Sequence, residues 1–352
     1  MSGGAATLMS VSACGQPPIS WRMATSWPKS LDIIYGGVQI ICDRVSEMTN
    51  GRFKITPYSV DDKVAGLGKK VEALQVLDAV ERGEIECGHT CGFYYLEKSQ
   101  ALSFATGVPF GLNAQQQNAW LYHGGGLEEI RRIYKDFGII NFPAGNTGVQ
   151  MGGWFKRQVN TQADLEGLKM RISGVGGQVM SKLGVNVEVL PASEIYNALD
   201  AGTIEAAEWI GPYDDEKLGL NKVASLYYYP GWWEPGTTFD ALVNLQEWNR
   251  LPKEYQKIFE TATYEANIRM LARYDSVNRE ALRRLTNDGN TELVRYSDDI
   301  INAAENAAWG LYEENARNDR QFKQVYDQWR AFREDIKQWH GIHELTFDRL
   351  NF

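Results

Sequence analysis

Hydrophobic and polar positions follow two alternating rhythms along the first part of the chain. Runs with a period of two predict short strands, and runs with a period near 3.6 predict amphipathic helices. The expected elements are strands at 21–25, 53–58 and 85–89 and helices at 31–49, capped by Ser30, and at 71–80. Strands that alternate with helices are typical of an open, mostly parallel α/β sheet.

The same rhythms continue and then become purely helical. The pattern predicts a helix at 118–137, strands at 138–143 and 149–155, a helix from 178 to 183, and helices at 253–288, 297–317 and 321–338. A tail that is this helical is expected to pack back over the rest of the protein or to reach a partner chain.

Two segments repeat each other in residue type and spacing, namely 79–86 (AVERGEIE) and 198–205 (ALDAGTIE). Each reads as a helix end, a glycine C-cap and the start of a strand. The repeat predicts two lobes of related construction. It gives His89 and Glu208 equivalent places, so the two strand ends are expected to converge on one cleft.

The stretch 164–177, DLEGLKMRISGVGG, organises the second of these lobes. Leu168, Met170 and Ile172 alternate with polar residues, and three glycines follow before the next helix. Arg171 is therefore expected near the carboxyl end of a strand with one buried face, beside a helix start, where open α/β sheets bind ligands and anions are favoured. Because a guanidinium offers a planar fork of donors, we expect Arg171 to hold an organic acid.

Length and charge narrow the class of protein. A chain of 352 residues favours two lobes. A net charge of −9 without a strongly basic stretch argues against a nucleic-acid partner. No apolar run is long enough to span a membrane. An anionic ligand would therefore need local positive charge at its own site.

The four cysteines have different surroundings. Cys42 lies on the apolar face of a predicted helix and is expected to be buried. Cys87 and Cys91 have no second Cys or His pair, which argues against a zinc site. Val11 to Cys14 resembles the end of a bacterial lipoprotein signal or is a chance cysteine in a short leader, so residues 1–18 are left out of the predicted fold.

Three further polar side chains stand among apolar or aromatic neighbours. Glu208 follows two alanines on a predicted strand, so it is either an ion-pair partner or a ligand group. Gln150 is expected on a strand, either as a core amide or in a site. Glu234, between Trp233 and Pro235, is either a loop residue or a ligand.

Several motifs together resemble the solute receptors of tripartite ATP-independent periplasmic (TRAP) transporters. They are DLEGLKMRISG, PASEIYNALDAGTIEAAEW and ALQVLDAVERGEIECGHT. The segments SWPKSLD, GVQMGGWF, EWIGPYDD and WWEPGT are similar to the branch that binds 2-oxo acids or small hydroxy acids with a metal ion. The resemblance covers residues 19–340.

The resemblance implies a two-lobed α/β periplasmic binding protein with a hinge and a long C-terminal helical region, without catalytic activity. Its lobes would comprise 19–143 and 144–235, and residues 236–352 would form the return across the hinge and the C-terminal helices. It also implies a periplasmic location, with a lipid anchor if Cys14 is modified. The implied partners are membrane permease subunits and a second copy bound through the C-terminal helices.

The resemblance also assigns the site. Arg171 matches the arginine that binds the acid's carboxylate, and a cation bridges ligand and protein. Oxygen donors of this kind suit sodium or calcium, and the sequence does not separate the two ions. The cation ligands that it implies are the Gln150 side chain, the Glu208 carboxylate, the Trp209 backbone carbonyl and the acidic position Glu234. Asn146 and either Tyr94 or Tyr95 match further ligand contacts.

Other functions have weaker support. The glycine pattern at 174–179 has Val179 in place of the third glycine of a dinucleotide site. The segment 123–126, HGGG, resembles an esterase oxyanion loop, but the chain has no G-x-S-x-G nucleophile motif. His89 reads as a packed strand residue instead of a catalytic base. A ligand sensor that moves no solute would use the same fold and site.

Overall fold

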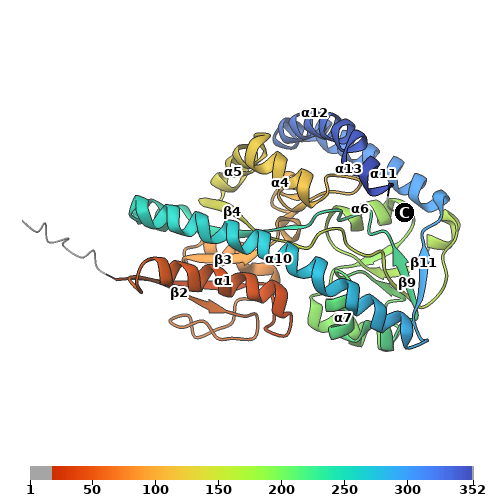
Figure 1. Cartoon of the computed structure of the whole chain (residues 1–352), viewed down its shortest axis with the longest axis horizontal. Helices are drawn as coiled ribbons and strands as arrows, with labels where there is room; N and C mark the ends of the chain where they lie inside the picture. Colours follow the sequence, from red (N-terminus) through yellow and green to blue (C-terminus); the bar gives the residue numbers. More distant parts are fainter. Residues whose placement is uncertain (1–17, 351–352) are drawn as a thin grey trace, which may run out of the picture.

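Two β-sheets form the two halves of the computed structural model, which describes residues 18–350 (Figure 1). Cys14 and the expected leader lie outside the described residues. The first sheet contains, in spatial order, β2 (Phe53–Tyr58), β1 (Ile19–Thr25), β3 (Cys87–Thr90), β10 (Thr238–Asn244) and β4 (Ile139–Asn146). The second contains β11 (Glu292–Arg295), β9 (Leu226–Tyr229), β5 (Gly153–Phe155), β8 (Ala206–Ala207), β6 (Lys169–Arg171) and β7 (Asn186–Glu188).

Each sheet contains one strand that runs against its neighbours. β10 is antiparallel to β3 and β4, and β5 is antiparallel to β8 and β9. These are the strands that enter a sheet directly from the other lobe. The remaining pairs of neighbouring strands are parallel, as the alternation of strands and helices predicted.

Helices cover both faces of each sheet, so each lobe has three layers. On the first sheet, α1 (Asp32–Met48) and α10 (Lys253–Asn287) cover one face, and α2 (Val76–Glu81), α3 (Ser103–Thr106) and α5 (Gly126–Asp136) cover the other. On the second sheet, α6 (Gly174–Lys182) and α11 (Asp298–Asn318) lie opposite α7 (Ala192–Asp200) and α8 (Pro212–Leu218). The two apolar clusters that result each continue from one lobe into the other.

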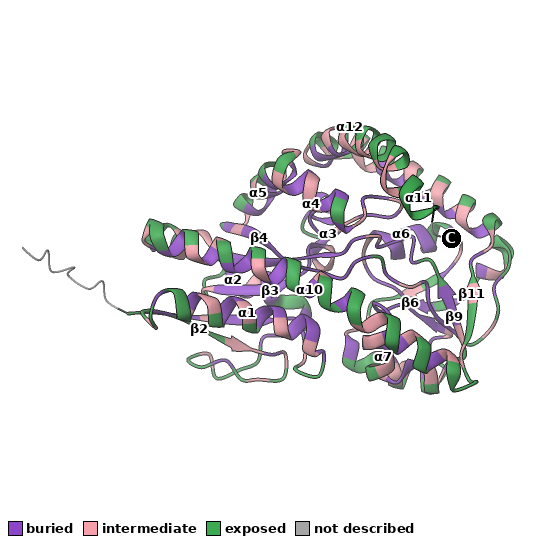
Figure 2. Cartoon of the chain, viewed as in Figure 1, coloured by how far each residue is buried: buried purple, intermediate pink, exposed green. Residues whose placement is uncertain are grey.

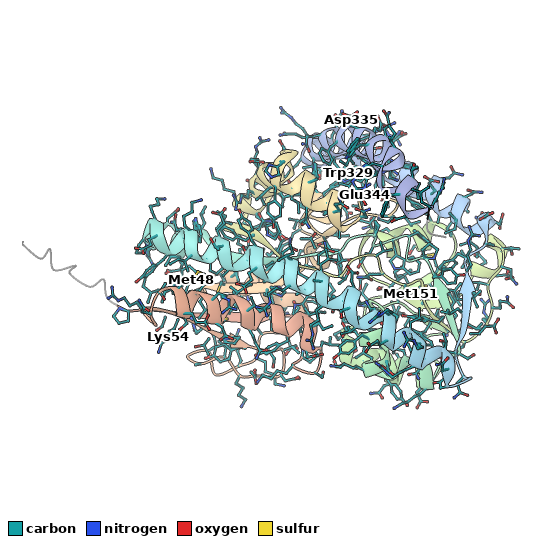
Figure 3. All side chains as sticks on the ribbon, in the orientation of Figure 1. Met48, Lys54, Met151, Trp329, Asp335 and Glu344 are labelled. Atoms are coloured by element: carbon teal, nitrogen blue, oxygen red, sulfur yellow. The ribbon has the colours of Figure 1, made fainter. Side chains whose placement is uncertain are left out.

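The C-terminal helices join the lobes. α10 packs against α1 in the first lobe and against α8 in the second, and it crosses the molecule in Figure 1. α12 (Arg320–Ile342) lies over α4 (Ala114–His123) and α5, with Trp329 directed inward and Asp335 outward (Figure 3). Exposed residues follow the outer sides of α10 and α12 (Figure 2). Among residues 18–350, no helix combines the length and the apolar character that a membrane span requires.

Two short linkers lie side by side between the sheets. The first, 147–152, leads from β4 to β5, and the second, 230–237, leads from β9 back to β10. They are joined by backbone hydrogen bonds from Thr147 to Thr237 (3.1 Å) and from Gln150 to Glu234 (3.2 Å). The first sheet thus extends to Asn146, beyond the predicted boundary at 143, and the return crossing begins before the predicted boundary at 235.

Several predicted elements differ from those observed. The helix predicted at 118–137 is two helices, α4 and α5, because Gly125 adopts a left-handed conformation (φ 84°) between them. The helix predicted at 71–80 is one 3₁₀ turn followed by α2. Ser30 does not cap α1, whose N-cap is Leu31 without a side-chain hydrogen bond. The predicted strand at 149–155 begins only at Gly153.

The repeated segments have the same local structure. Gly83 and Gly202 both adopt positive φ angles, 67° and 72°, and each follows the C-cap residue of its helix, α2 or α7. In each copy the two backbone amides that follow the glycine donate to the carbonyl of the aligned alanine, Ala79 or Ala198. His89 then lies in β3, and Glu208 directly follows β8. The predicted correspondence is therefore present at the end of both strands.

Asp240, at the centre of the first sheet, should make stability depend on pH. Burial raises its pKa to about 7, although hydrogen bonds from Asn141 (2.9 Å) and Tyr134 (3.0 Å) oppose the shift. An unfolded aspartate loses its proton near pH 4. Between these two values the folded state holds a proton that the unfolded state has lost, so the free energy of unfolding falls as pH rises, by up to about 1.4 kcal/mol per pH unit.

The variant Asp240→Asn tests this expectation, because it keeps the shape and removes the proton. Urea unfolding between pH 4.5 and 7.5 should show the variant gaining stability relative to the wild type as pH rises. A difference between the two proteins that stays constant across this range would contradict the shifted pKa.

Candidate functional site

Arg171 is the last residue of β6 and is 1% exposed. Its Nε donates to the Leu190 carbonyl (3.0 Å), and its Nη1 donates to the backbone carbonyl (2.8 Å) and the carboxylate of Glu208. Its guanidinium lies over the Trp209 ring, 5.1 Å from the centroid. The sequence predicts a strand with only one buried face. This prediction is wrong from Arg171 onward, since the neighbouring side chains of Met170 and Arg171 are both buried. None of the hydrogen bonds among the described residues involves Nη2.

Glu208 and Trp209 follow β8, the neighbouring parallel strand. The Glu208 amide donates to the Arg171 carbonyl (3.1 Å), which fixes the register of the two strand ends. Asp215 then holds the turn, because its carboxylate accepts from the amides of Ile210 (3.2 Å) and Gly211 (3.1 Å). The backbone that presents Glu208 and Trp209 is therefore fixed by buried hydrogen bonds.

Gln150 and Glu234 lie on the two linkers between the lobes. The Gln150 Nε2 donates to the Thr237 hydroxyl (2.9 Å), which donates to the Glu234 carboxylate (2.7 Å). This chain of donors fixes the orientation of the amide. The Gln150 Oε1 has no hydrogen-bond partner among the described residues, although the residue is only 4% exposed. Buried polar atoms are normally hydrogen-bonded, so this one requires an explanation.

These residues meet at one cavity between the lobes. It holds about 20 Å³, roughly one water molecule. Its polar wall comes from the second lobe and the linkers, and includes Gln150, Arg171, Glu208, Trp209, Glu234 and Thr237. The opposite wall comes from the first sheet and its loops, and consists of Trp27, Phe93, Tyr94 and Phe239. Sequence reasoning missed Trp27, Phe93 and Phe239, although Trp27 lies in the SWPKSLD motif.

Direct contacts hold the two lobes together around this cavity. Phe93 packs on Gly174, where an added Cβ would lie 3.0 Å from the Phe93 Cβ. Gln178 donates to Gln100 (3.0 Å), and Asp32 of α1 accepts from Tyr213 (3.2 Å) and pairs with Lys217. The lobes must separate to admit any ligand larger than water.

Two of the candidate residues are occupied elsewhere. The Asn146 side chain donates to the Gly236 carbonyl and the Thr238 hydroxyl, and accepts from the Gly148 amide. The Tyr95 hydroxyl contacts Thr90 and accepts from the Leu77 amide. Neither side chain lines the cavity. Of the two tyrosines considered, Tyr94 lines it.

Negative charge is crowded in the cavity. Burial raises the pKa of Glu208, and the nearby Arg171 guanidinium opposes this shift. Burial also raises the pKa of Glu234, and the neighbouring Glu208 charge raises it further. Two carboxylates in a buried cavity repel strongly, so a proton or a cation is needed between them.

The donor atoms suit a hard cation. Sodium and calcium prefer carboxylate, amide and carbonyl oxygens, and the cavity is lined by Glu208, Glu234 and Gln150, whose Oε1 has no partner among the described residues. Within residues 18–350 no three His, Cys, Asp or Glu side chains form a cluster of the kind that transition metals favour. Cys42, Cys87 and Cys91 are buried free thiols.

Comparisons with known proteins show the family to which the chain belongs. Residues 23–319 match the family described as bacterial extracellular solute-binding protein, family 7. A monocarboxylate 2-oxoacid-binding periplasmic protein of Nostoc sp. is 62% identical over 336 residues, which is 96% of this chain and 90% of the relative.

Solved structures have the same fold. A TRAP solute-binding protein from Bordetella bronchiseptica, a mixed-occupancy dimer with calcium and picolinate in one active site, has a TM-score of 0.92 and 45% identity, and covers 96% of this chain and 98% of that one. A TRAP solute-binding protein from Colwellia psychrerythraea with bound calcium and pyruvate has a TM-score of 0.90 and 35% identity, and covers 95% of this chain and 100% of that one. One from Pseudoalteromonas atlantica with bound sodium and pyruvate has a TM-score of 0.90 and 34% identity, and covers 94% of this chain and 99% of that one. The chain thus belongs to family 7 of the bacterial extracellular solute-binding proteins, the TRAP solute receptors, and is a binding protein, not an enzyme.

Proposed function

We propose that this chain is a periplasmic TRAP receptor that binds a small monocarboxylate of the 2-oxo acid class together with sodium or calcium and delivers it to membrane permease subunits. The observation that carries the proposal is the buried, unpartnered Gln150 Oε1, which shares a cavity with the Arg171 guanidinium and two carboxylates. The names of the Nostoc relative and of the two pyruvate-bound structures support it.

The chemistry of a 2-oxo acid fits these residues. Such an acid presents a carboxylate oxygen and an adjacent keto oxygen, which can chelate one cation from one side. Gln150, Glu208, Glu234 and the Trp209 carbonyl would hold that cation, which offsets the repulsion between the protein's carboxylates and the ligand's. Arg171 would take the remaining edge of the acid's carboxylate through Nη2. A hydroxy acid such as lactate offers a similar pair of oxygens.

Purified protein provides the test. Elemental analysis and mass spectrometry should find calcium or sodium and a small acid, since a cavity that closes to the size of one water releases its contents slowly. Calorimetry on unfolded and refolded, ligand-free protein should then show pyruvate binding with calcium or sodium and little binding in a chelator with potassium as the only alkali ion. Turnover of the acid, or equal binding in both buffers, would contradict the proposal.

Transport and sensing share this site. Uptake of labelled pyruvate by cells with and without the receptor separates them, because a sensor leaves the uptake rate unchanged. The lipid anchor at Cys14 and the homodimer stay predictions of the sequence. A dimer through the C-terminal helices is supported by the exposed apolar side chains near that end, which are Trp339, Ile342, Leu345, Phe347 and Leu350.

A further inference from the structure

The two walls of the cavity differ in chemistry, and this orients the ligand. Every charged side chain assigned to the acid or the cation lies on the wall built by the second lobe and the linkers, and on the opposite wall the assigned group that can hydrogen-bond is the Tyr94 hydroxyl. The head of a 2-oxo acid, its carboxylate and keto group, must therefore face that wall. The substituent beyond the keto carbon then points toward the aromatic wall of the first lobe, where Trp27, Tyr94 and Phe239 lie.

Trp27 is a member of the aromatic wall that is held by a side-chain hydrogen bond. Its Nε1 donates to the Nδ1 of His89 (2.9 Å), and the His89 Nε2 lies 3.3 Å from the Ala144 carbonyl, to which it donates. Its ring packs edge-on against Phe239, with 5.0 Å between centroids. Trp27 is 2% exposed and His89 is fully buried, so the indole cannot swing away without breaking a buried hydrogen bond.

The protonation state of His89 suits this role. A nitrogen that accepts from an indole must be unprotonated. Burial lowers the pKa of His89 to about 4, so the ring is neutral throughout the physiological range, with its single proton on Nε2. His89 therefore holds Trp27 in the same way whatever the external pH.

We propose that Trp27, held in place by His89, sets the size of the acid that the receptor accepts by limiting the substituent on the keto carbon. This inference rests on the proposed function and adds a specificity-determining residue and its positioning residue to it. A rigid, well-packed wall discriminates between ligands that differ by one methylene group by roughly 10- to 200-fold.

The test compares pyruvate with a straight four-carbon and a branched five-carbon 2-oxo acid, by calorimetry in saturating calcium. In Trp27→Phe the wall recedes, so the affinity for the branched acid relative to pyruvate should rise by roughly 10-fold or more. His89→Phe leaves the aromatic wall complete but removes the acceptor for Trp27. His89→Phe should also raise the affinity for the branched acid relative to pyruvate, by a smaller factor. A general loss of stability would not change this relative affinity.

Trp21→Phe is the matched control. Trp21 lies on β1 in the same lobe, is 4% exposed, and packs on Phe53 away from the cavity. In Trp21→Phe we expect the affinity for the branched acid relative to pyruvate to equal the wild-type value. If Trp27→Phe and His89→Phe bind all three acids with the wild-type ratio, the inference is wrong and the proposed function stands. If the wild-type protein binds none of them, both are wrong.

Discussion

Replacing Arg171 with methionine should lower the affinity for pyruvate by roughly 100-fold or more. A charge-assisted hydrogen bond contributes about 1.5–3 kcal/mol, and the acid's carboxylate would lose its guanidinium partner while facing Glu208 and Glu234. Arg171→Lys should recover only part of the loss, because an ammonium group lacks the planar fork. Calorimetry in saturating calcium measures both values.

Stability has to be separated from binding in this experiment. Removing one partner of a buried ion pair destabilises a protein by about 3–5 kcal/mol, since it leaves the other charge buried and unpaired. The double variant Arg171→Met, Glu208→Gln should therefore be more stable than Arg171→Met alone while still failing to bind pyruvate. A double variant that regains binding would mean that Arg171 acts only through Glu208.

Arg131 offers a matched control. It is a partly buried arginine of α5 that donates to the Asn141 carbonyl (3.3 Å) and lies outside the cavity. Arg131→Met should change the melting temperature and leave the pyruvate affinity at the wild-type value. Equal losses of affinity in Arg131→Met and Arg171→Met would show that any buried arginine is enough to disturb binding.

The elements that could be predicted from the sequence are those set by local pattern. The amphipathic period of α1 and α10, the glycines after α2 and α7, and the place of Arg171 at a strand end before a helix all follow from short-range rules. The repeat also related His89 to Glu208 correctly. These features depend on residues within a few positions of each other.

The errors come from contacts that are distant in the sequence. Gln150 was predicted on a strand because apolar residues flank it, but it lies in a linker whose partner is the second linker at 230–237. Asn146 matches a ligand position by resemblance, which stays a prediction, and nothing in the sequence indicates that its side chain bonds Gly236 and Thr238 across that same pair of segments. The aromatic wall was missed because Trp27, Phe93 and Phe239 come from three separate loops or strands, and no local signal joins them.

The cation should be as important for binding as the arginine. Glu208→Gln removes the carboxylate charge that would bind the cation and that accepts a hydrogen bond from Arg171, keeps the shape of the side chain, and leaves an amide oxygen. The attraction of a divalent ion to one carboxylate is twice that of a monovalent ion at equal distance, so the variant should lose roughly 100-fold or more in calcium affinity and less in sodium affinity. Pyruvate binding should weaken in parallel, because the cation bridges the acid to the protein.

The comparison with Asp240→Asn makes this prediction specific. Asp240 is also a fully buried carboxylate with a raised pKa, but it lies within the first sheet and does not line the cavity. Its amide variant should bind calcium and pyruvate as the wild type does. In Glu208→Gln the cation is held more weakly, so a larger share of the residual pyruvate binding should rest on Arg171, and this binding should respond less to a chelator than in the wild type. Wild-type affinity in that variant, with the response to chelator retained, would mean that the cation is bound elsewhere.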